Sequence, residues 1–166
     1  MAALHLDSRR MVMIGSKGES DASQPDASRP VMSGGQLLEL IDRALADLDR
    51  DQRMGPVLSA SGMRVRLEVT DLGLTLDVAA VEGSADHHIR WGFTDAGWEP
   101  KLSLRMGSAT ANLYLQGQES LAIAIDRGRV RCRGESRVAI LYLPLLRLIV
   151  EPYTRAVRES APALAV

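Results

Sequence analysis

The chain has 166 residues, enough for one domain with its own core, and its apolar and charged fractions of 46% and 25% exclude collagen-like, coiled-coil and wholly disordered chains. A net charge of −1 excludes a general attraction to nucleic acid or to anionic membranes. Cys132 is the only cysteine, which excludes an internal disulfide and a cysteine-rich zinc site, so we expect a reducing, cytoplasmic setting. No apolar run reaches the roughly 18 residues that a membrane-spanning helix needs.

The first 32 residues differ in composition from the rest. Residues 15–30 are rich in Ser, Asp, Gly and Pro and have too few apolar side chains to bury. We therefore predict a disordered leader over residues 1–32, followed by a single domain over residues 33–166. Met11, Met13 and Met32 are alternative start sites.

An amphipathic helix of about four turns is predicted at the start of this domain. Its apolar residues recur at helical spacing: Leu37, Leu38, Ile41, Ala44, Leu45 and Leu48. Gly55 and Pro56 are expected to end it.

Five segments then alternate apolar and polar residues, the pattern of a strand with one buried face. They are residues 63–69, 74–78, 89–93, 101–106 and 129–133. Turn-forming residues between the first three predict hairpins. Because strands and helices are segregated along the chain, we predict an α+β fold with a mainly antiparallel sheet and helices packed on one face.

The other elements are shorter and more apolar. Two short helices are predicted over residues 108–117 and 119–126, and glycine ends or follows each. Residues 138–143 are apolar throughout and are assigned as a candidate sixth strand. An apolar helix is predicted after Pro144, with a break or kink at Pro152.

No catalytic signature is present in the sequence: it lacks a nucleophile elbow, a phosphate-binding loop, a dinucleotide fingerprint and a His-Glu-x-x-His motif. His87 and His88 are adjacent, so on a strand they would point to opposite faces and could not hold one metal ion together. Cys132 falls on the apolar side of its strand, as expected for an inert thiol. We predict neither a metal site nor a cofactor.

Arginines gather on the polar side of the predicted strands: Arg64, Arg66, Arg90, Arg105, Arg129, Arg131 and Arg133. They fit either a docking surface for phosphates or an anionic membrane, or a solvated face neutralised by Glu68 and Asp77, and we favour the second. No aromatic residue interleaves them, which argues against binding of single-stranded nucleic acid.

Residues 138–150 are the most apolar part of the chain, with Arg147 as their single charge. A helix this apolar must bury more than one face. Composition leaves three roles open: a central core helix, a wall or lid of a ligand cavity, and a dimer face.

Residues 100–146 resemble the second half of a sterol carrier protein 2 (sterol-binding) domain. The resemblance rests on a strand ending in Met106, two short helices ending near Gly117 and Gly128, and a strand of alternating Arg and apolar residues before Gly134. Residues 36–99 fit the family more loosely. Gly107–Thr110 and Gln118–Glu119 depart from its pattern, in which acidic residues and Asn-Pro stand at these places. The resemblance implies a five-stranded sheet, helices on one face and an apolar tunnel that binds lipids, usually without chemistry.

The leading hypothesis is non-catalytic binding or carriage of an apolar molecule, such as a sterol, an acyl lipid, an isoprenoid quinone or a polyketide-like metabolite. The predicted ligand-binding residues are Ile89, Trp91, Phe93, Leu104, Leu113, Ile140, Leu145, Leu148 and Ile149. One alternative is a small cyclase- or isomerase-type enzyme, for which His87, Trp98 and Tyr142 are the polar groups to test. The other is a protein-assembly module. Partner hypotheses are transient contact with a membrane surface, a partner enzyme and a homodimer, with no nucleic acid.

Overall fold

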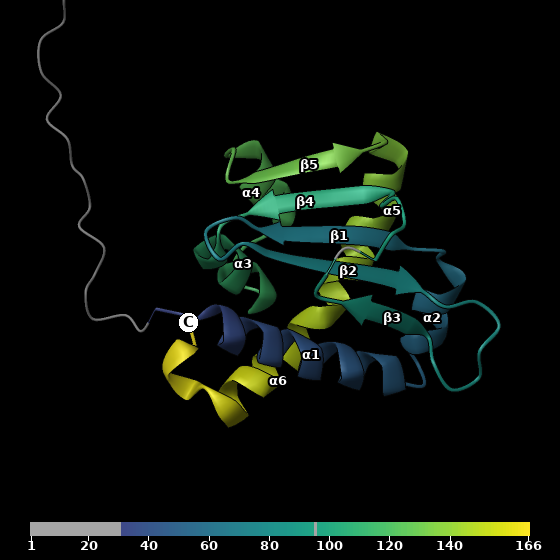
Figure 1. The fold of residues 1–166 in the computed structure, drawn as a ribbon, viewed down its shortest axis with the longest axis horizontal. Helices are drawn as coiled ribbons and strands as arrows, with labels where there is room; N and C mark the ends of the chain where they lie inside the picture. Colours follow the sequence, from purple (N-terminus) through teal and green to yellow (C-terminus); the bar gives the residue numbers. More distant parts are fainter. Residues whose placement is uncertain (1–30, 95) are drawn as a thin grey trace, which may run out of the picture.

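The computed structural model describes residues 31–94 and 96–166 (Figure 1). Most of the predicted leader, residues 1–30, lies outside the described part. Its last residue, Met32, is buried in the core, so packing begins just before the predicted domain start.

The described residues form a five-stranded sheet with helices on one face (Figure 1). The strands are β1 (Arg64–Val69), β2 (Leu74–Ala80), β3 (Ile89–Gly92), β4 (Leu102–Met106) and β5 (Val130–Gly134). Their order is β3-β2-β1-β4-β5; β1 and β4 run parallel, and the other neighbours are antiparallel. The predicted α+β class and mainly antiparallel sheet are confirmed.

Six α-helices and two 3₁₀ turns are found in the described residues. They are α1 (Gly34–Arg50), α2 (Gly55–Ala60), α3 (Ser108–Leu115), α4 (Leu121–Asp126), α5 (Ser136–Leu146), η1 (Arg147–Ile149), α6 (Val150–Ser160) and η2 (Pro162–Leu164). Among these residues, no helix is both long and apolar enough to cross a bilayer.

The candidate sixth strand is wrong, because residues 138–143 belong to helix α5. A short run that is apolar at every position has no period that separates a strand from a buried helix. Gly134 ends β5 against the β4 backbone, where a Cβ would lie 2.6 Å from the carbonyl oxygen of Lys101. The chain then turns at Glu135, the N-cap of α5.

The structure corrects two predictions about where prolines end or break helices. Helix α1 ends at Arg50, before Gly55 and Pro56, and these two residues begin α2 instead. Proline suits the first turn of a helix because its missing N–H has no partner there. Near the C-terminus the helix breaks at η1, and Pro152 lies in the first turn of α6, where it cannot donate to the carbonyl of Leu148.

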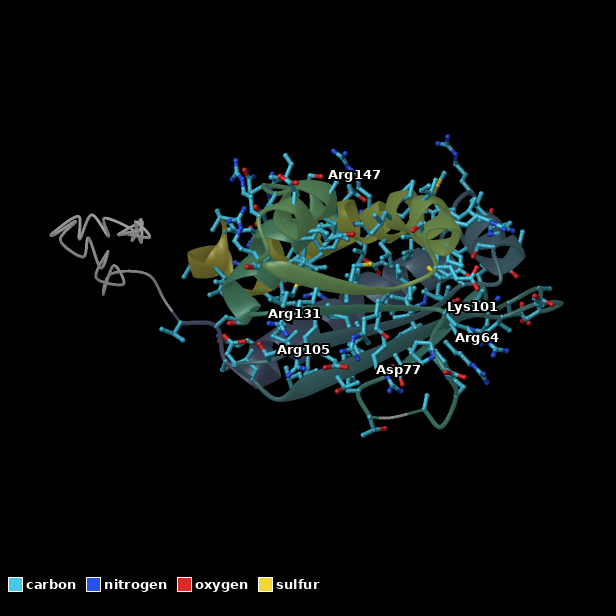
Figure 2. The ribbon with its side chains drawn as sticks, turned by 90° about the horizontal axis from the view of Figure 1, so that it is seen from above. Arg64, Asp77, Lys101, Arg105, Arg131 and Arg147 are labelled. Atoms are coloured by element: carbon cyan, nitrogen blue, oxygen red, sulfur yellow. The ribbon has the colours of Figure 1, made fainter. Side chains whose placement is uncertain are left out.

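Strand register divides the sheet into an apolar and a charged face. Val65, Val78 and Leu102 meet across three strands, and their face carries the helices. The opposite face carries Arg64, Arg66, Arg90, Arg105, Arg131 and Arg133 (Figure 2). Arg129 lies outside this group, because it precedes β5 and pairs with Glu119.

The two predicted neutralising residues do pair with arginines on the charged face. Asp77 is 1% exposed and accepts two hydrogen bonds from the Arg66 guanidinium, at 2.7 and 2.8 Å. Asp77 also accepts the backbone N–H of Ala96 at 2.9 Å, which fastens the loop after β3 over this face. Glu68 lies 3.6 Å from Arg105. Carboxylates on this face therefore neutralise part of its positive charge.

Asp49 connects the end of α1 to the start of β3. Asp49 is 5% exposed, and its carboxylate accepts the backbone N–H groups of His88 at 2.6 Å and Ile89 at 2.9 Å, with the ring Nδ1 of His87 at 2.9 Å. Burial alone would raise the pKa of Asp49, but these hydrogen bonds hold it below its ordinary value. The ionised carboxylate is thus the form that the fold stabilises.

Replacing Asp49 with alanine should lower the free energy of unfolding by about 2–4 kcal/mol, because two buried backbone donors lose their acceptor. Because the pKa of Asp49 is lowered in the folded state, its contribution is complete above the unfolded-state pKa. It is lost as the pH falls through the lower folded-state value. Urea unfolding of wild type and Asp49→Ala at several pH values tests both points.

Asp47→Ala is the matched control. Asp47 is an exposed carboxylate on the same helix, 3.4 Å from Arg155, so its loss should change stability by less than about 1 kcal/mol. Equal losses in the two variants would contradict the role given to Asp49.

Candidate functional site

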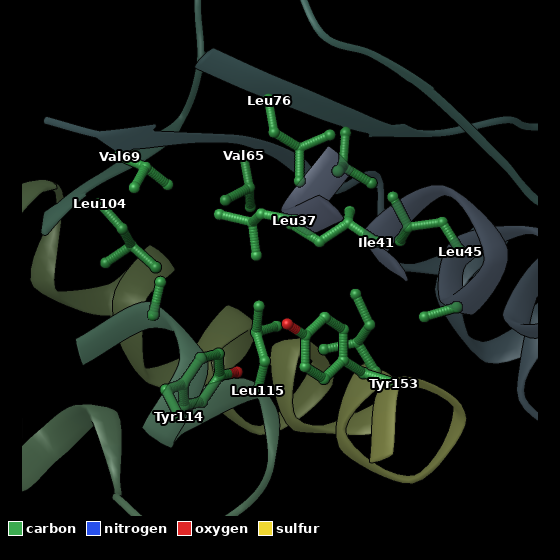
Figure 3. Close-up of a cluster of buried hydrophobic side chains, with 14 of the residues drawn as sticks. Leu37, Ile41, Leu45, Val65, Val69, Leu76, Leu104, Tyr114, Leu115 and Tyr153 are labelled. Carbon is green, nitrogen blue, oxygen red and sulfur yellow. The ribbon is translucent and has the colours of Figure 1, made fainter. Parts of the chain in front are cut away.

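Buried apolar side chains of the strands and the helices face one another between the two layers (Figure 3), and an apolar cavity lies among them. The strands contribute inward-facing aliphatic side chains such as Val65, Leu76 and Leu104, since alternate residues of a strand share one face. Helices close it from the other side. The closing residues are Ile41, Leu45 and Leu48 of α1, Leu58 of α2, Tyr114 and Leu115 of α3, Leu145 and Leu146 of α5, and Ile149 of η1.

The cavity holds about 60 Å³, far less than the roughly 300–1,000 Å³ of a typical ligand pocket. Its walls are apolar apart from the Tyr114 hydroxyl, so it would exclude water and favour an apolar occupant. A lipid-sized tunnel is therefore not open in this conformation. Binding a larger molecule would require part of the wall to move.

Tyr114 is the one wall residue with a polar group of its own. Its side chain is buried, and its hydroxyl has no hydrogen-bond partner among the described residues. Burial raises the pKa of this hydroxyl well above its usual value, and nearby Arg147 only partly offsets that effect. The group is thus a neutral O–H that can both donate and accept a hydrogen bond.

Tyr114 also lines a larger groove of about 400 Å³ beside the cavity. The groove runs between residues 117–122 and the segment that contains Leu143, Pro144, Arg147 and Val150. Glu119 lies in its wall, where one carboxylate oxygen pairs with Arg129 and the other is buried without a partner among the described residues. The groove therefore adds unpaired polar groups next to an apolar cavity.

The structure divides the predicted ligand-binding residues into three groups. Ile89, Leu104, Leu145 and Ile149 line the cavity. Trp91, Phe93 and Leu148 pack against the core without lining it. Leu113 is half-buried outside both the core and the cavity, and Ile140 is 74% exposed at the surface.

Sequence reasoning chose Leu113 from α3, whereas the neighbours Tyr114 and Leu115 reach the cavity. Helix α3 is apolar on most sides, so periodicity gave no direction to its buried face. The same problem affected Ile140, which lies on a helix that is apolar almost all round. Trp91 does not line the cavity, and its indole N–H donates to Asp42 of α1 at 2.9 Å.

The three residues proposed for an enzyme lie in separate places. His87 is 72% exposed and bound to Asp49, and Trp98 lies in the loop beside Asp77 on the charged face of the sheet. Tyr142 is buried on the helical side and donates to the carbonyl oxygen of Gly62 at 3.1 Å. The structure does not bring them together into one acid–base site.

Two further polar features bear on chemistry. Cys132 is half-buried on the inner face, and burial raises the pKa of its thiol, which disfavours the reactive thiolate. Among the described residues, no cluster of three or more His, Cys, Asp or Glu side chains could hold a metal ion. His87 is exposed and His88 is half-buried.

Comparison with known proteins finds likeness in structure alone. No family model matches the sequence, and no curated protein matches it. The Thermus thermophilus protein TT1886, whose description suggests a sterol carrier protein, superposes with a TM-score of 0.51 and 13% identity over 77% of this chain and 94% of its own. A ubiquinone synthesis protein, UbiJ-SCP2, gives 0.49 and 15% identity over 72% of this chain and 96% of its own.

A variant of the sec-alkyl sulfatase PisA1 gives a TM-score of 0.50 and 12% identity over 69% of this chain, which corresponds to 16% of the sulfatase. The same arrangement thus occurs as a free domain and as a small part of a larger enzyme. Together with the strand order and the one-sided helical layer, these likenesses show that the chain has the sterol carrier protein 2-like fold.

Proposed function

We propose that this protein binds an apolar small molecule between its sheet and its helices and carries it without chemical change. The observation that carries the proposal is the apolar cavity, which shares Tyr114 as a wall residue with the neighbouring groove. The candidate ligands are a sterol, an acyl lipid, an isoprenoid quinone or a polyketide-like metabolite. The description of TT1886, which suggests a sterol carrier protein, adds support.

Helix α5 and η1 are the part of the wall best suited to move. Tyr142 is the only buried residue of α5, and Leu145, Leu146 and Leu148 are half-buried. Segments with little buried surface open at low free-energy cost. Outward movement of this segment would join the 60 Å³ cavity to the 400 Å³ groove and make room for a ligand.

The unpaired groups of the groove suit a ligand with one polar end. The Tyr114 hydroxyl can donate to an oxygen of the ligand, and the free Glu119 oxygen can accept from a hydroxyl. A bound molecule would satisfy groups that are costly to bury alone. The cytoplasmic setting stays a prediction, as does the absence of catalysis.

Native mass spectrometry of the purified protein, followed by organic extraction, tests the proposal directly. A stoichiometric apolar adduct is expected, either as purified or after incubation with sterols, quinones and acyl chains. An adduct-free mass under all these conditions would contradict binding. Chemical conversion of a panel member would move the assignment to the enzyme alternative.

Leu145→Trp should weaken binding of a fluorescent dansyl fatty acid by about 10-fold or more, because the larger side chain fills the cavity. Leu141→Trp is the matched control on the same helix: Leu141 is 61% exposed and lines neither the cavity nor the groove. Fluorescence titration measures both, with circular dichroism to check folding. If Leu145→Trp and Leu141→Trp bound the fatty acid equally well, this cavity would not be part of the binding site.

Tyr114→Phe should raise the free energy of unfolding by about 1 kcal/mol or more, since it removes a buried hydroxyl without a partner. It should also weaken binding of ligands with an oxygen-bearing end. Tyr153→Phe is the control and should lower stability by about 1 kcal/mol, because the Tyr153 hydroxyl donates to the side chain of Asn112 at 3.3 Å. A stability loss in Tyr114→Phe would show that its hydroxyl is already satisfied.

A further inference from the structure

Helix α5 and the first residue of η1 carry a continuous exposed row of residues, which we call the α5 stripe: Arg137, Ile140, Leu141 and Pro144 of α5 and Arg147 of η1. Their spacing of three or four residues places them on one side of the helix. Ile140 is 74% and Leu141 61% exposed, while Tyr142 on the other side is buried. The stripe thus presents an apolar centre with an arginine at each end.

Exposure of two adjacent large aliphatic side chains on a helix is the kind of patch that marks an interaction surface. No carboxylate lies on the stripe. The nearest in sequence are Glu135, the N-cap of α5, and Glu151 in the next helix, which lies 3.5 Å from Arg155. The charge of the stripe is therefore wholly positive.

The stripe borders the groove of the candidate site, because Pro144 and Arg147 also line that groove. Arg147 lies on the helical side of the molecule, away from Arg105 and Arg131 on the charged sheet face (Figure 2). A surface that covered the stripe would therefore meet the groove directly. The arginines of the sheet would face the other way.

A second copy of the chain is a poor occupant of this surface. Antiparallel pairing of two stripes would set Arg137 of each copy beside Arg147 of the other, and parallel pairing would set each arginine beside its own equivalent. Both arrangements bring like charges together in a desolvated contact, which costs free energy. An anionic surface that also accepts aliphatic side chains would pair with the arginines at both ends of the stripe and bury the apolar residues at its centre.

We propose that the α5 stripe docks on an anionic lipid bilayer. Ile140 and Leu141 enter the boundary between headgroups and acyl chains, and Arg137 and Arg147 contact the lipid phosphates. This placement opens the groove onto the membrane. It also puts the least buried part of the cavity wall at the surface where an apolar molecule would enter or leave.

Co-sedimentation of the full chain with phosphatidylcholine vesicles, with and without phosphatidylglycerol, tests the proposal. Binding is expected only with the anionic lipid and should weaken as salt is raised. Arg137→Gln with Arg147→Gln should lower the apparent affinity by about 30-fold, since each basic residue near such a surface contributes about 5-fold. Ile140→Ser with Leu141→Ser should lower it by about 10-fold or more.

Two matched controls separate this surface from the rest of the molecule. Arg131→Gln with Arg133→Gln removes two exposed charges from the sheet face, and Val57→Ser removes a side chain that is 47% exposed on α2. Both should bind vesicles as wild type does. Ile140→Ser with Leu141→Ser should keep its affinity for the dansyl fatty acid, so loss of membrane binding is distinguished from loss of the carrier function.

Absence of vesicle binding under all conditions would overturn the proposal. Equal loss in the Arg131 and Arg133 control would overturn it in favour of the sheet face. Sedimentation velocity supplies the remaining outcome: a dimer that dissociates in the Ile140 and Leu141 variant would assign the stripe to a second copy and reject the bilayer.

Discussion

The one-sided burial of the sheet is the constraint on which the rest of the structure depends. Alternate residues of each strand point to the same face, and the registers bring the apolar residues of all five strands to one side. That side must be covered, and α1, α2, α3, α5 and η1 contribute the side chains that close the cavity over it. The same alternation collects the arginines on the other side, where Asp77 and Glu68 neutralise only part of the charge.

Helix α5 covers the sheet but buries little of its own apolar surface. Leu145 and Leu146 reach the cavity, but Tyr142 is the only residue of the helix that is fully buried. The helix has more apolar side chains than its buried side can hold, and Ile140 and Leu141 are therefore exposed to solvent. A segment held this lightly fits a movable wall, and its outer surface fits a membrane contact. The proposed carrier function and the proposed docking surface thus arise from one helix.

Tyr114 and Glu119 show a second kind of imperfect fit. Each leaves a buried polar atom without a partner in the described part of the chain, and both line the groove next to the cavity. Unpaired buried groups lower stability, so their position beside an apolar cavity agrees with a site that a ligand completes. By contrast, the buried carboxylate of Asp49 is fully paired: it accepts three hydrogen bonds and connects α1 to β3.

The sequence by itself predicted the α+β class, helix α1, the five strands and the resemblance to the sterol carrier protein 2-like fold. Each depends on local periodicity or on the spacing of Met106, Gly117, Gly128 and Gly134. Those signals are local. The first three strands pair as the predicted hairpins, whereas the parallel pairing of β1 with β4 was not predicted. The residues of the cavity were predicted only in part: Ile89, Leu104, Leu145 and Ile149 line it, but Trp91, Phe93, Leu113, Ile140 and Leu148 do not.

The tertiary structure alone decided three features: that residues 138–143 form a helix, which side of that helix is buried, and that Tyr114 lines both the cavity and the groove. Apolar residues at every position carry no period, so neither the type of element nor its buried side can be read from them. Both the type of element and its buried side depend on which other parts of the chain pack against the segment.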